Sequence, residues 1–443
     1  MNTKLTKKEF VSVSLMLFAM FFGSGNLIFP PILGNQAGTS MWASLLGFAI
    51  TAVIFPVLGI LAIAKTNGVK NLGNRVGPLF ALVYPAIIFL SIGPGIAIPR
   101  NGSLAFEMSV APYLPTGSSV DLWRVVYTVI FFALALYLCL QPSKLVDRMG
   151  KVMTPVLLVL LVIFFVGSVI KLPVEVGQPT EAYKSPVVKG FLEGYNTMDT
   201  LASLNFGLVI ALTIRRYQVK EEKEVIKYAS RAGLIAGAVL FVVYAMIAYV
   251  GQISSVANAG AENGGRILFN VTNQVFGGFG AIVLVLIFTL ACLTTVVGLI
   301  TSVSEYFAEL THNKPGYKAW TLIFTFVSLV LANFGLNNIL VFSVPILVAI
   351  YPVAIVLIVM ALLQDKFNFS RLNYKVTVYV TFLISIIQGL KAASIEVPVL
   401  SNLMSKLPFY AEGLEWVLPA FLIMTVFSLL DKAKAHILQV NKL

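Results

Sequence analysis

Apolar runs of about 20 residues recur from one end of this 443-residue chain to the other, with only short polar segments between them. A bilayer core of about 30 Å is crossed by roughly 20 helical residues, whose backbone groups bond within the helix. Since 58% of the residues are hydrophobic and 11% are charged, a water-soluble domain would lack polar surface. The sequence therefore predicts an all-α polytopic membrane protein in a lipid bilayer.

About twelve transmembrane helices fit the chain. They are expected at residues 10–33, 40–64, 78–99, 122–140, 152–170, 188–214, 230–251, 277–304, 317–333, 337–362, 374–391 and 412–430. No long polar linker separates them, so residues 1–443 are expected to form a single transmembrane transport domain.

The basic residues are distributed unequally between the two predicted sides of the membrane. The side of the N-terminus carries 23 of the 31, and the other side carries 8. This is the positive-inside bias, which predicts that both termini are cytoplasmic. It also accounts for the net charge of +12 without a nucleic acid as partner, and no obligate protein partner is evident.

The first and sixth predicted spans are each interrupted by a polar, glycine-containing stretch, at residues 23–26 and 194–197. Five spans separate the two breaks, so the two sets of five begin on opposite sides of the membrane. This order predicts an inverted repeat, with residues 10–170 as the first half and 188–362 as the second. Two additional helices, 374–430, lie outside the repeat.

An unwound stretch at bilayer depth persists only where it faces protein, water or a ligand. Gly23, Ser24 and Gly25 permit such a stretch, and the half-helix from Asn26 would offer free N–H donors to a substrate carboxylate. Asp199 follows the second break inside an apolar run, where a charge needs a partner or a cavity. The alternatives are close helix packing for the small residues and a helix cap for Asp199.

A second set of polar groups suggests a cation site. Ala291, Thr294 and Thr295 share one helical face, and carbonyls freed near Ala19 and Phe22 could complete an all-oxygen cage. Hydroxyls in membrane helices also often bond back to their own backbone, which is the alternative. The fifth span contains no basic residue that could replace a metal ion, which favours Na⁺ over a proton as the coupling ion.

Arg100 and Glu107 lie seven residues apart beyond the kinks of the third span and form a possible outer gate, or an ordinary surface pair. No catalytic motif accompanies them: the chain has two histidines and lacks the metalloprotease, nucleophile-elbow and P-loop patterns. We therefore expect no enzymatic activity and no cofactor.

Three of these stretches resemble the BrnQ-type branched-chain amino acid carriers, which are leucine, isoleucine and valine cation symporters. They are residues 18–31 around the first break, 92–100 in the third span and 194–202 around the second break. The resemblance covers essentially the full length. More distantly, the family is similar to five-plus-five inverted-repeat transporters of the LeuT kind, and it implies the cytoplasmic membrane of a bacterium.

The resemblance also implies roles for residues. Gly23, Ser24 and Gly25 would take the substrate carboxylate. Tyr195, Asn196 and Thr197 would lie against the substrate amine and side chain. The implied Na⁺ ligands are Ala19, Phe22, Ala291, Thr294 and Thr295. Asp199 departs from the distant relatives, and a second cation site is not clearly matched.

Together, the residues and the resemblance predict a secondary active symporter that imports leucine, isoleucine and valine with Na⁺ by alternating access. Two alternatives stay open, which are proton coupling with Asp199 as the carrier, and transport of another small neutral amino acid. An ion channel is disfavoured because the sequence has no filter-like motif.

Overall fold

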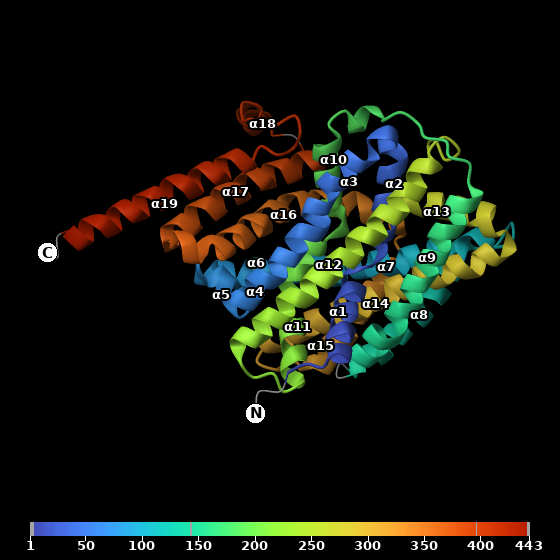
Figure 1. The fold of residues 1–443 in the computed structure, drawn as a ribbon, viewed down its shortest axis with the longest axis horizontal. Coiled ribbons are helices and arrows are strands. Elements are labelled where there is room, and N and C mark those ends of the chain that lie inside the picture. Colours follow the sequence, from blue (N-terminus) through green and yellow to red (C-terminus); the bar gives the residue numbers. More distant parts are fainter. Residues whose placement is uncertain (1–3, 142–143, 396, 441–443) are drawn as a thin grey trace.

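The computed structural model describes residues 4–141, 144–395 and 397–440, and every regular element within them is a helix (Figure 1). The helices are α1 Lys7–Phe21, α2 Ser24–Ala37, α3 Met41–Ala49, α4 Phe55–Thr66, α5 Val69–Asn74, α6 Pro78–Leu90, α7 Ala97–Ser109, α8 Val120–Cys139, α9 Thr154–Lys171, α10 Pro186–Glu193, α11 Asp199–Arg216, α12 Glu222–Ile253, α13 Gly264–Phe276, α14 Gly278–Leu310, α15 Tyr317–Ala332, α16 Leu336–Phe367, α17 Arg371–Ala392, α18 Pro398–Met404 and α19 Val417–Val440. The predicted all-α membrane fold is thereby confirmed.

Local signals in the sequence explain where several helices begin and end. Thr6 and Glu9 form a reciprocal capping box at the start of α1, in which the Thr6 N–H donates to the Glu9 carboxylate at 2.8 Å. Asn67 ends α4 and Asn368 ends α16, both in the left-handed conformation that asparagine tolerates.

The described residues contain eight helical stretches that are long and apolar enough to cross a membrane, or nine if α10 and α11 count as one span bent by 46°. The expected number of twelve is therefore not confirmed. One reason is that α2, α3 and α4 join into a continuous helical run of 43 residues. Another is that α1 and α15, with 15 and 16 residues, are shorter than a full crossing.

Some boundaries also differ from the expectation. The third span was expected to end at residue 99, but after a kink at Gly93 the chain resumes as α7 and continues to Ser109. The seventh span was expected to begin at residue 230, but α12 already begins at Glu222. α7 continues through polar residues because most of its side chains are buried in protein, whereas the first residues of α12, Glu222 and Lys223, are exposed.

Two interhelical contacts relate the halves of the chain to each other. The second half of the first span, α2, packs on α12, and the first half of the sixth span, α10, packs on α3. Both contacts bring backbones together at glycines: a Cβ on Gly34 would lie 1.9 Å from the Ala248 carbonyl oxygen, and one on Gly190 would lie 1.9 Å from the Ser44 carbonyl oxygen. Such exchanged pairing is what an inverted repeat produces, since each broken span packs on the second span of the other half.

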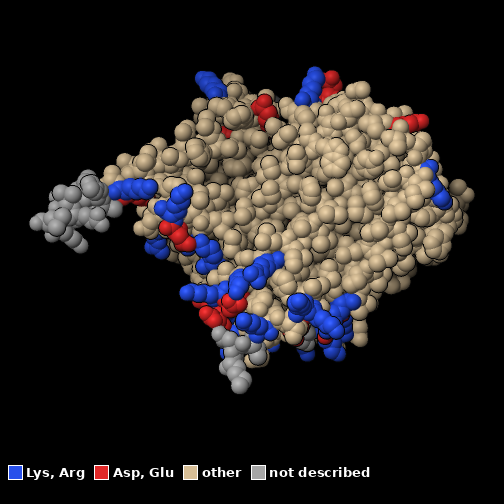
Figure 2. Space-filling view, in the orientation of Figure 1, with Lys and Arg blue, Asp and Glu red and all other residues tan. Residues whose placement is uncertain are grey.

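Charged side chains are concentrated at the ends of the molecule. Figure 2 shows Lys and Arg gathered at the end where the N-terminus lies, with a wide uncharged belt above them and few charges at the opposite end. The broken helices α1–α2 and α10–α11 lie inside this belt, surrounded by α7, α12 and α14. The candidate site is therefore placed in the interior, away from both charged ends.

Candidate functional site

The first break lies between α1 and α2 and is stabilised by asparagine side chains. Gly23 is extended, with φ −122° and ψ −153°, so its N–H does not bond within α1. That N–H donates to Asn26 Oδ1 at 3.0 Å, and the Ser24 N–H donates to Asn101 Oδ1 at 2.8 Å. Two of the backbone donors expected to hold a substrate carboxylate are thus bonded to amide side chains in this structure.

The second break lies between α10 and α11. Residues Gly194–Thr197 form a short 3₁₀ turn, and Met198 then adopts the left-handed conformation with φ 67°. A buried methionine in this conformation is strained, and the conformation persists because the surrounding structure enforces it. The Thr197 hydroxyl donates to the Gly194 carbonyl at 2.9 Å, and Tyr351 accepts the Thr200 N–H at 3.2 Å. The expected interruption of the sixth span is confirmed.

Asp199 connects the two breaks. Its side chain is buried and 2% of the residue is exposed. Asn26 Nδ2 donates to its carboxylate at 2.7 Å, the Tyr244 hydroxyl donates to it at 2.9 Å, and Asn26 also hydrogen-bonds Tyr244. Because these donors come from α2 and α12, the carboxylate joins three helices. The alternative role, a cap at the start of α11 alone, does not account for these contacts.

Arg100 also joins the two breaks, from α7. It is 2% exposed; its Nε donates to Ser24 Oγ at 3.1 Å and its Nη1 donates to the Asn196 carbonyl at 2.8 Å. The guanidinium passes directly over Gly25, where a Cβ would lie 2.7 Å from Nη2. Glycine at this position therefore makes room for the arginine.

The expected pairing of Arg100 with Glu107 is not formed in the described structure. Glu107 instead accepts the N–H of Leu336 at 3.0 Å, at the first residue of α16. A reading of the two as an ordinary surface pair is wrong, because Arg100 is buried. Both residues lie in α7, beyond the kink at Gly93, and two turns of helix separate them along its axis.

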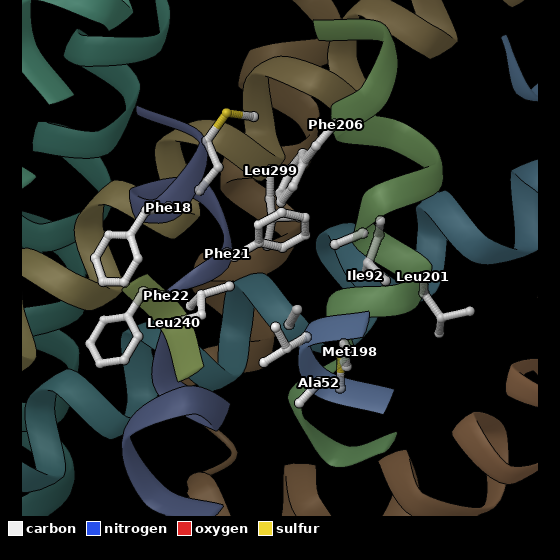
Figure 3. Packing of buried hydrophobic residues seen from close by; sticks show 14 of the residues in the cluster. Phe18, Phe21, Phe22, Ala52, Ile92, Met198, Leu201, Phe206, Leu240 and Leu299 are labelled. Carbon is white, nitrogen blue, oxygen red and sulfur yellow. The ribbon is translucent and has the colours of Figure 1, made fainter. Parts of the chain in front are cut away.

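These residues surround one small cavity. Its polar wall contains Ser24, Asn26, Arg100, Asn101, Asp199 and Thr295. Its apolar wall contains Phe21, Phe206 and Leu299, whose side chains point toward one another in Figure 3, with the two phenylalanine rings 5.2 Å apart. The space open to the centres of water-sized molecules is about 20 Å³, room for about one water molecule. An amino acid can occupy it only if the walls move apart.

The residues after the second break divide between two places. Thr197 and Asp199 line the small cavity, and Asn196 contributes its carbonyl to Arg100. Tyr195 faces away from it, stacked on Tyr351 with ring centroids 4.1 Å apart, and lines a separate, larger cavity. The group predicted to lie against the substrate is therefore only partly assembled.

The candidate cation ligands are also only partly assembled. Thr295 Oγ donates to the Ala19 carbonyl at 3.1 Å, and this carbonyl is available because the Gly23 N–H bonds elsewhere. Thr294 Oγ bonds back to its own helix, to the carbonyls of Leu290 at 2.9 Å and Ala291 at 3.0 Å. Phe22 is buried at the end of α1. Thr294 therefore behaves as the alternative predicted, with its hydroxyl bonded to its own helix. Thr295 instead reaches across to α1.

Two residues of this network were not predicted, namely Asn101 and Tyr244. Asn101 follows Arg100 directly in a span kinked by glycine and proline, so a polar pair in such a place was a usable signal. Tyr244 is one of three tyrosines in α12, with Tyr228 and Tyr249, and nothing in the pattern distinguishes it from tyrosines that pack on lipid.

Residues 6–434 match the profile of the family described as "Branched-chain amino acid transport protein". The chain belongs to this family of transport proteins. It is 42% identical to the branched-chain amino acid permease BraB of Bacillus subtilis (strain 168), over 95% of this chain and 94% of the permease. It is 38% identical to the branched-chain amino acid transport system 2 carrier protein of Pseudomonas aeruginosa, over 97% and 98% of the two chains.

Among solved structures the chain is similar to Mhp1, a nucleobase-cation-symport-1 family transporter. The form described as closed, with bromovinylhydantoin bound, matches with a TM-score of 0.53 and 15% identity, over 92% of this chain and 96% of that one. The inward-facing form matches with the same TM-score and 14% identity. The likeness shows the fold, and it confirms the LeuT-like architecture that was expected for this chain.

Proposed function

We propose that this protein imports leucine, isoleucine and valine across a bacterial cytoplasmic membrane, coupled to Na⁺, by alternating access. The observation that carries the proposal is the cavity between the two breaks, which combines a buried guanidinium, Arg100, with a buried carboxyl group, Asp199, and an apolar wall. An α-amino acid with an aliphatic side chain has these same three chemistries. The family and its named relatives support the choice of branched-chain substrates.

The polar wall suggests how a zwitterion would be oriented. A substrate carboxylate would replace part of the hydrogen bonding of Arg100, whose planar fork matches a carboxylate, beside Ser24 at the positive end of α2. The ammonium would lie on the side of Asp199 and Thr197. Opposite charges thus fix the direction of the substrate in a site that water barely enters.

The apolar wall explains a broad specificity. Phe21, Phe206 and Leu299 offer surface without a hydrogen-bonding group. In such a pocket one methylene changes the binding free energy by about 1–3 kcal/mol. We therefore expect leucine, isoleucine and valine to share the site with modest differences in affinity, and other small neutral amino acids to compete more weakly.

Coupling to Na⁺ is proposed at Thr295 and the Ala19 carbonyl, which lie 3.1 Å apart beside the first break. A cation bound there would hold α1 against α14 and so favour the arrangement that binds substrate. One positive charge moved inward gains roughly 2.3 kcal/mol per 100 mV. At 1.4 kcal/mol per tenfold, this corresponds to about a 50-fold gradient of substrate.

Uptake of labelled leucine into proteoliposomes tests the proposal. At fixed pH, replacing external Na⁺ by choline is expected to abolish uptake, and excess isoleucine or valine is expected to compete. Unchanged uptake in choline would reject Na⁺ coupling, whereas failure of isoleucine and valine to compete would reject the substrate class.

Proton coupling is the second candidate. The burial of Asp199 between the two breaks supports it, because a buried carboxyl group at this place could carry the proton. Asp199→Asn separates the two. If the proton is the coupling ion, this variant loses uptake driven by a pH gradient but retains exchange of internal for external leucine. If Na⁺ is the coupling ion, uptake by the wild type requires no pH gradient.

A further inference from the structure

A basic cleft lies between α5, α6 and the first turns of α17. Two adjoining hollows form it, with volumes of about 340 and 420 Å³. Arg371, the first residue of α17, lies in the wall of both hollows. Arg75 lines the first and Lys375 lines the second, and the described residues of the two walls include no aspartate or glutamate. The cleft therefore attracts anions.

The three basic side chains are not neutralised by the protein itself. In the part of the chain that the structure describes, none of them forms an ion pair with a carboxylate. Acidic residues beside the cleft are engaged elsewhere, since Asp365 pairs with Lys65 at 2.7 Å and Asp431 accepts the Ser370 N–H at 3.0 Å. The positive charge is thus available to a partner from outside the chain.

Two helix N-termini add to the positive potential of the cleft. α6 begins at Pro78 and α17 begins at Arg371, and both residues lie in its walls. The N-terminal end of a helix carries a partial positive charge that favours a bound anion. Arg75 is held in place, because its Nη1 donates to the Tyr374 hydroxyl at 2.8 Å and its guanidinium lies 5.7 Å from the centre of that ring. A side chain that is already oriented loses less freedom when an anion binds.

The surface that leads away from the cleft along α17 changes from charged to apolar. Every fourth residue on one side of this helix is exposed, in the order Arg371, Lys375, Tyr379 and Leu383. This spacing sets them about 6 Å apart along the helix. Across the cleft, Leu79 at the start of α6 is 71% exposed. Figure 2 shows basic side chains along the lower edge of the molecule, directly beside uncharged surface.

This order of chemistries matches an anionic phospholipid that lies parallel to the helices. Its phosphate meets the basic end, its glycerol and ester groups lie at the level of the tyrosine, and its acyl chains contact the aliphatic end. Basic pockets between membrane helices bind anionic headgroups, and tyrosine favours the boundary between headgroups and hydrocarbon. A soluble anion would use only the charged end and would leave the apolar stripe unexplained.

We propose that the basic cleft binds one anionic phospholipid from the leaflet on the side of the N-terminus. The phosphate lies between Arg371 and Lys375, and Arg75 faces the rest of the headgroup. One acyl chain runs along α17 and the other over Leu79. The lipid joins α6 to α17, which form opposite walls of the cleft. This inference depends neither on the transported substrate nor on the coupling ion.

Lipid retention by the purified full-length protein tests the proposal. Native mass spectrometry in a mild detergent counts the lipids that are held when equal amounts of phosphatidylglycerol and phosphatidylcholine with the same acyl chains are added. We expect the wild type to hold one phosphatidylglycerol at least about tenfold more tightly than phosphatidylcholine. The double variant Arg371→Gln, Lys375→Gln is expected to lose this preference. Lys314→Gln with Lys318→Gln removes the same charge from exposed positions between α14 and α15 and is the matched control.

Competition with inorganic phosphate distinguishes a lipid from a soluble anion. A large molar excess of phosphate is expected to leave the phosphatidylglycerol bound, because phosphate cannot use the apolar surface. Displacement by phosphate would assign the cleft to a soluble anion and overturn the proposal. A wild type without preference for phosphatidylglycerol would also overturn it, and both of these measurements need no variant. Equal loss in the control, or a preference kept by a double variant that elutes as the wild type does in size exclusion, would contradict it as well.

Discussion

Arg100 and Asp199 are the two residues whose environments demand a functional explanation. Both are buried at bilayer depth, where an ionised group is costly unless it is paired. Asp199 accepts hydrogen bonds from Asn26 and Tyr244, whereas Arg100 donates to a hydroxyl and a carbonyl and forms no ion pair with a carboxylate among the described residues. A substrate carboxylate would give Arg100 an anionic partner.

Substitution of Arg100 tests this role. Arg100→Lys keeps the charge but loses the fork that reaches Ser24 and Asn196 together. Loss of one charged hydrogen bond is worth about 1.5–3 kcal/mol, so we expect the leucine concentration for half-maximal uptake to rise by at least about tenfold. Uptake assays in proteoliposomes measure it, with the exposed Arg266→Lys as control. An unchanged value would show that Arg100 only stabilises the fold.

The two threonines of α14 are expected to behave differently. Thr295→Ala removes the hydroxyl that reaches the Ala19 carbonyl, so the Na⁺ concentration for half-maximal uptake should rise about tenfold, and Thr295→Ser should restore it. Thr294→Ala should raise it less, because that hydroxyl bonds to its own helix. Uptake measured over a series of Na⁺ concentrations decides. Wild-type dependence in both alanine variants would remove the pair from the cation site.

At the scale of elements, the broken spans are held by glycine contacts rather than by large side chains. α2 approaches α12, and α10 approaches α3, so closely that a methyl group at Gly34 or Gly190 would overlap a carbonyl oxygen. Helices in lipid associate through such close packing because apolar side chains gain little from leaving an apolar solvent. These contacts place both breaks at a fixed depth.

Gly190→Ala tests the contact between α10 and α3. Its Cβ would lie 1.9 Å from the Ser44 oxygen, so the helices must separate, at a cost of about 1–3 kcal/mol. We expect a lower melting temperature in detergent and reduced uptake. Gly233→Ala is the matched control, since its Cβ would be 3.5 Å from the nearest atom and alanine favours the helix. Equal stability of the two variants would contradict the packing argument.

At the scale of the whole molecule, the cavity between the two breaks is too narrow for an amino acid, so the protein must change shape to bind one. About 20 Å³ of space between the breaks does not admit leucine, so binding requires α1, α2, α10 or α11 to move against α7 and α14. Rocking of one helix set against another about the breaks supplies such a motion. In the proposed mechanism, both halves of the chain would contact the substrate at once.

Ligand binding should therefore stabilise the whole protein. At a leucine concentration of 100 times the dissociation constant, linkage gives about 2.7 kcal/mol, which raises the melting temperature measurably. We expect leucine, isoleucine and valine to have this effect in Na⁺ and a smaller one in choline. Lysine, whose charged side chain cannot enter the apolar wall, should have none. Equal stabilisation by lysine would contradict the assigned site.

The orientation of the chain in the membrane is predicted from its charges and is also testable. With Cys139 and Cys292 buried, single cysteines can be introduced at Lys7 and Lys184, which lie at opposite ends. A membrane-impermeant maleimide is expected to label Lys184→Cys in intact cells and Lys7→Cys only after permeabilisation. Reversed labelling would show that the N-terminus is outside.

Much of the architecture was predictable because lipid constrains it residue by residue. Length and hydropathy indicate the helices, and two glycine-containing polar stretches indicate the breaks, since each signal lies within one span. The family resemblance added the expected ligands. The boundary at Ser109 was missed because protein replaces lipid around the polar α7, and the boundary at Glu222 was missed because α12 begins with exposed charged residues.

The sequence by itself determined that this chain crosses a membrane as helices and that two of them break. Only the tertiary structure decided which side chains meet there: Asn101 binds Ser24 across 77 residues, and Asn26 binds Asp199 across 173. It also moved Arg100 from an expected gate into the interior. The physical reason is that helix formation in lipid depends on local hydrogen bonds and hydropathy, whereas the partner of a buried charge depends on how distant helices pack.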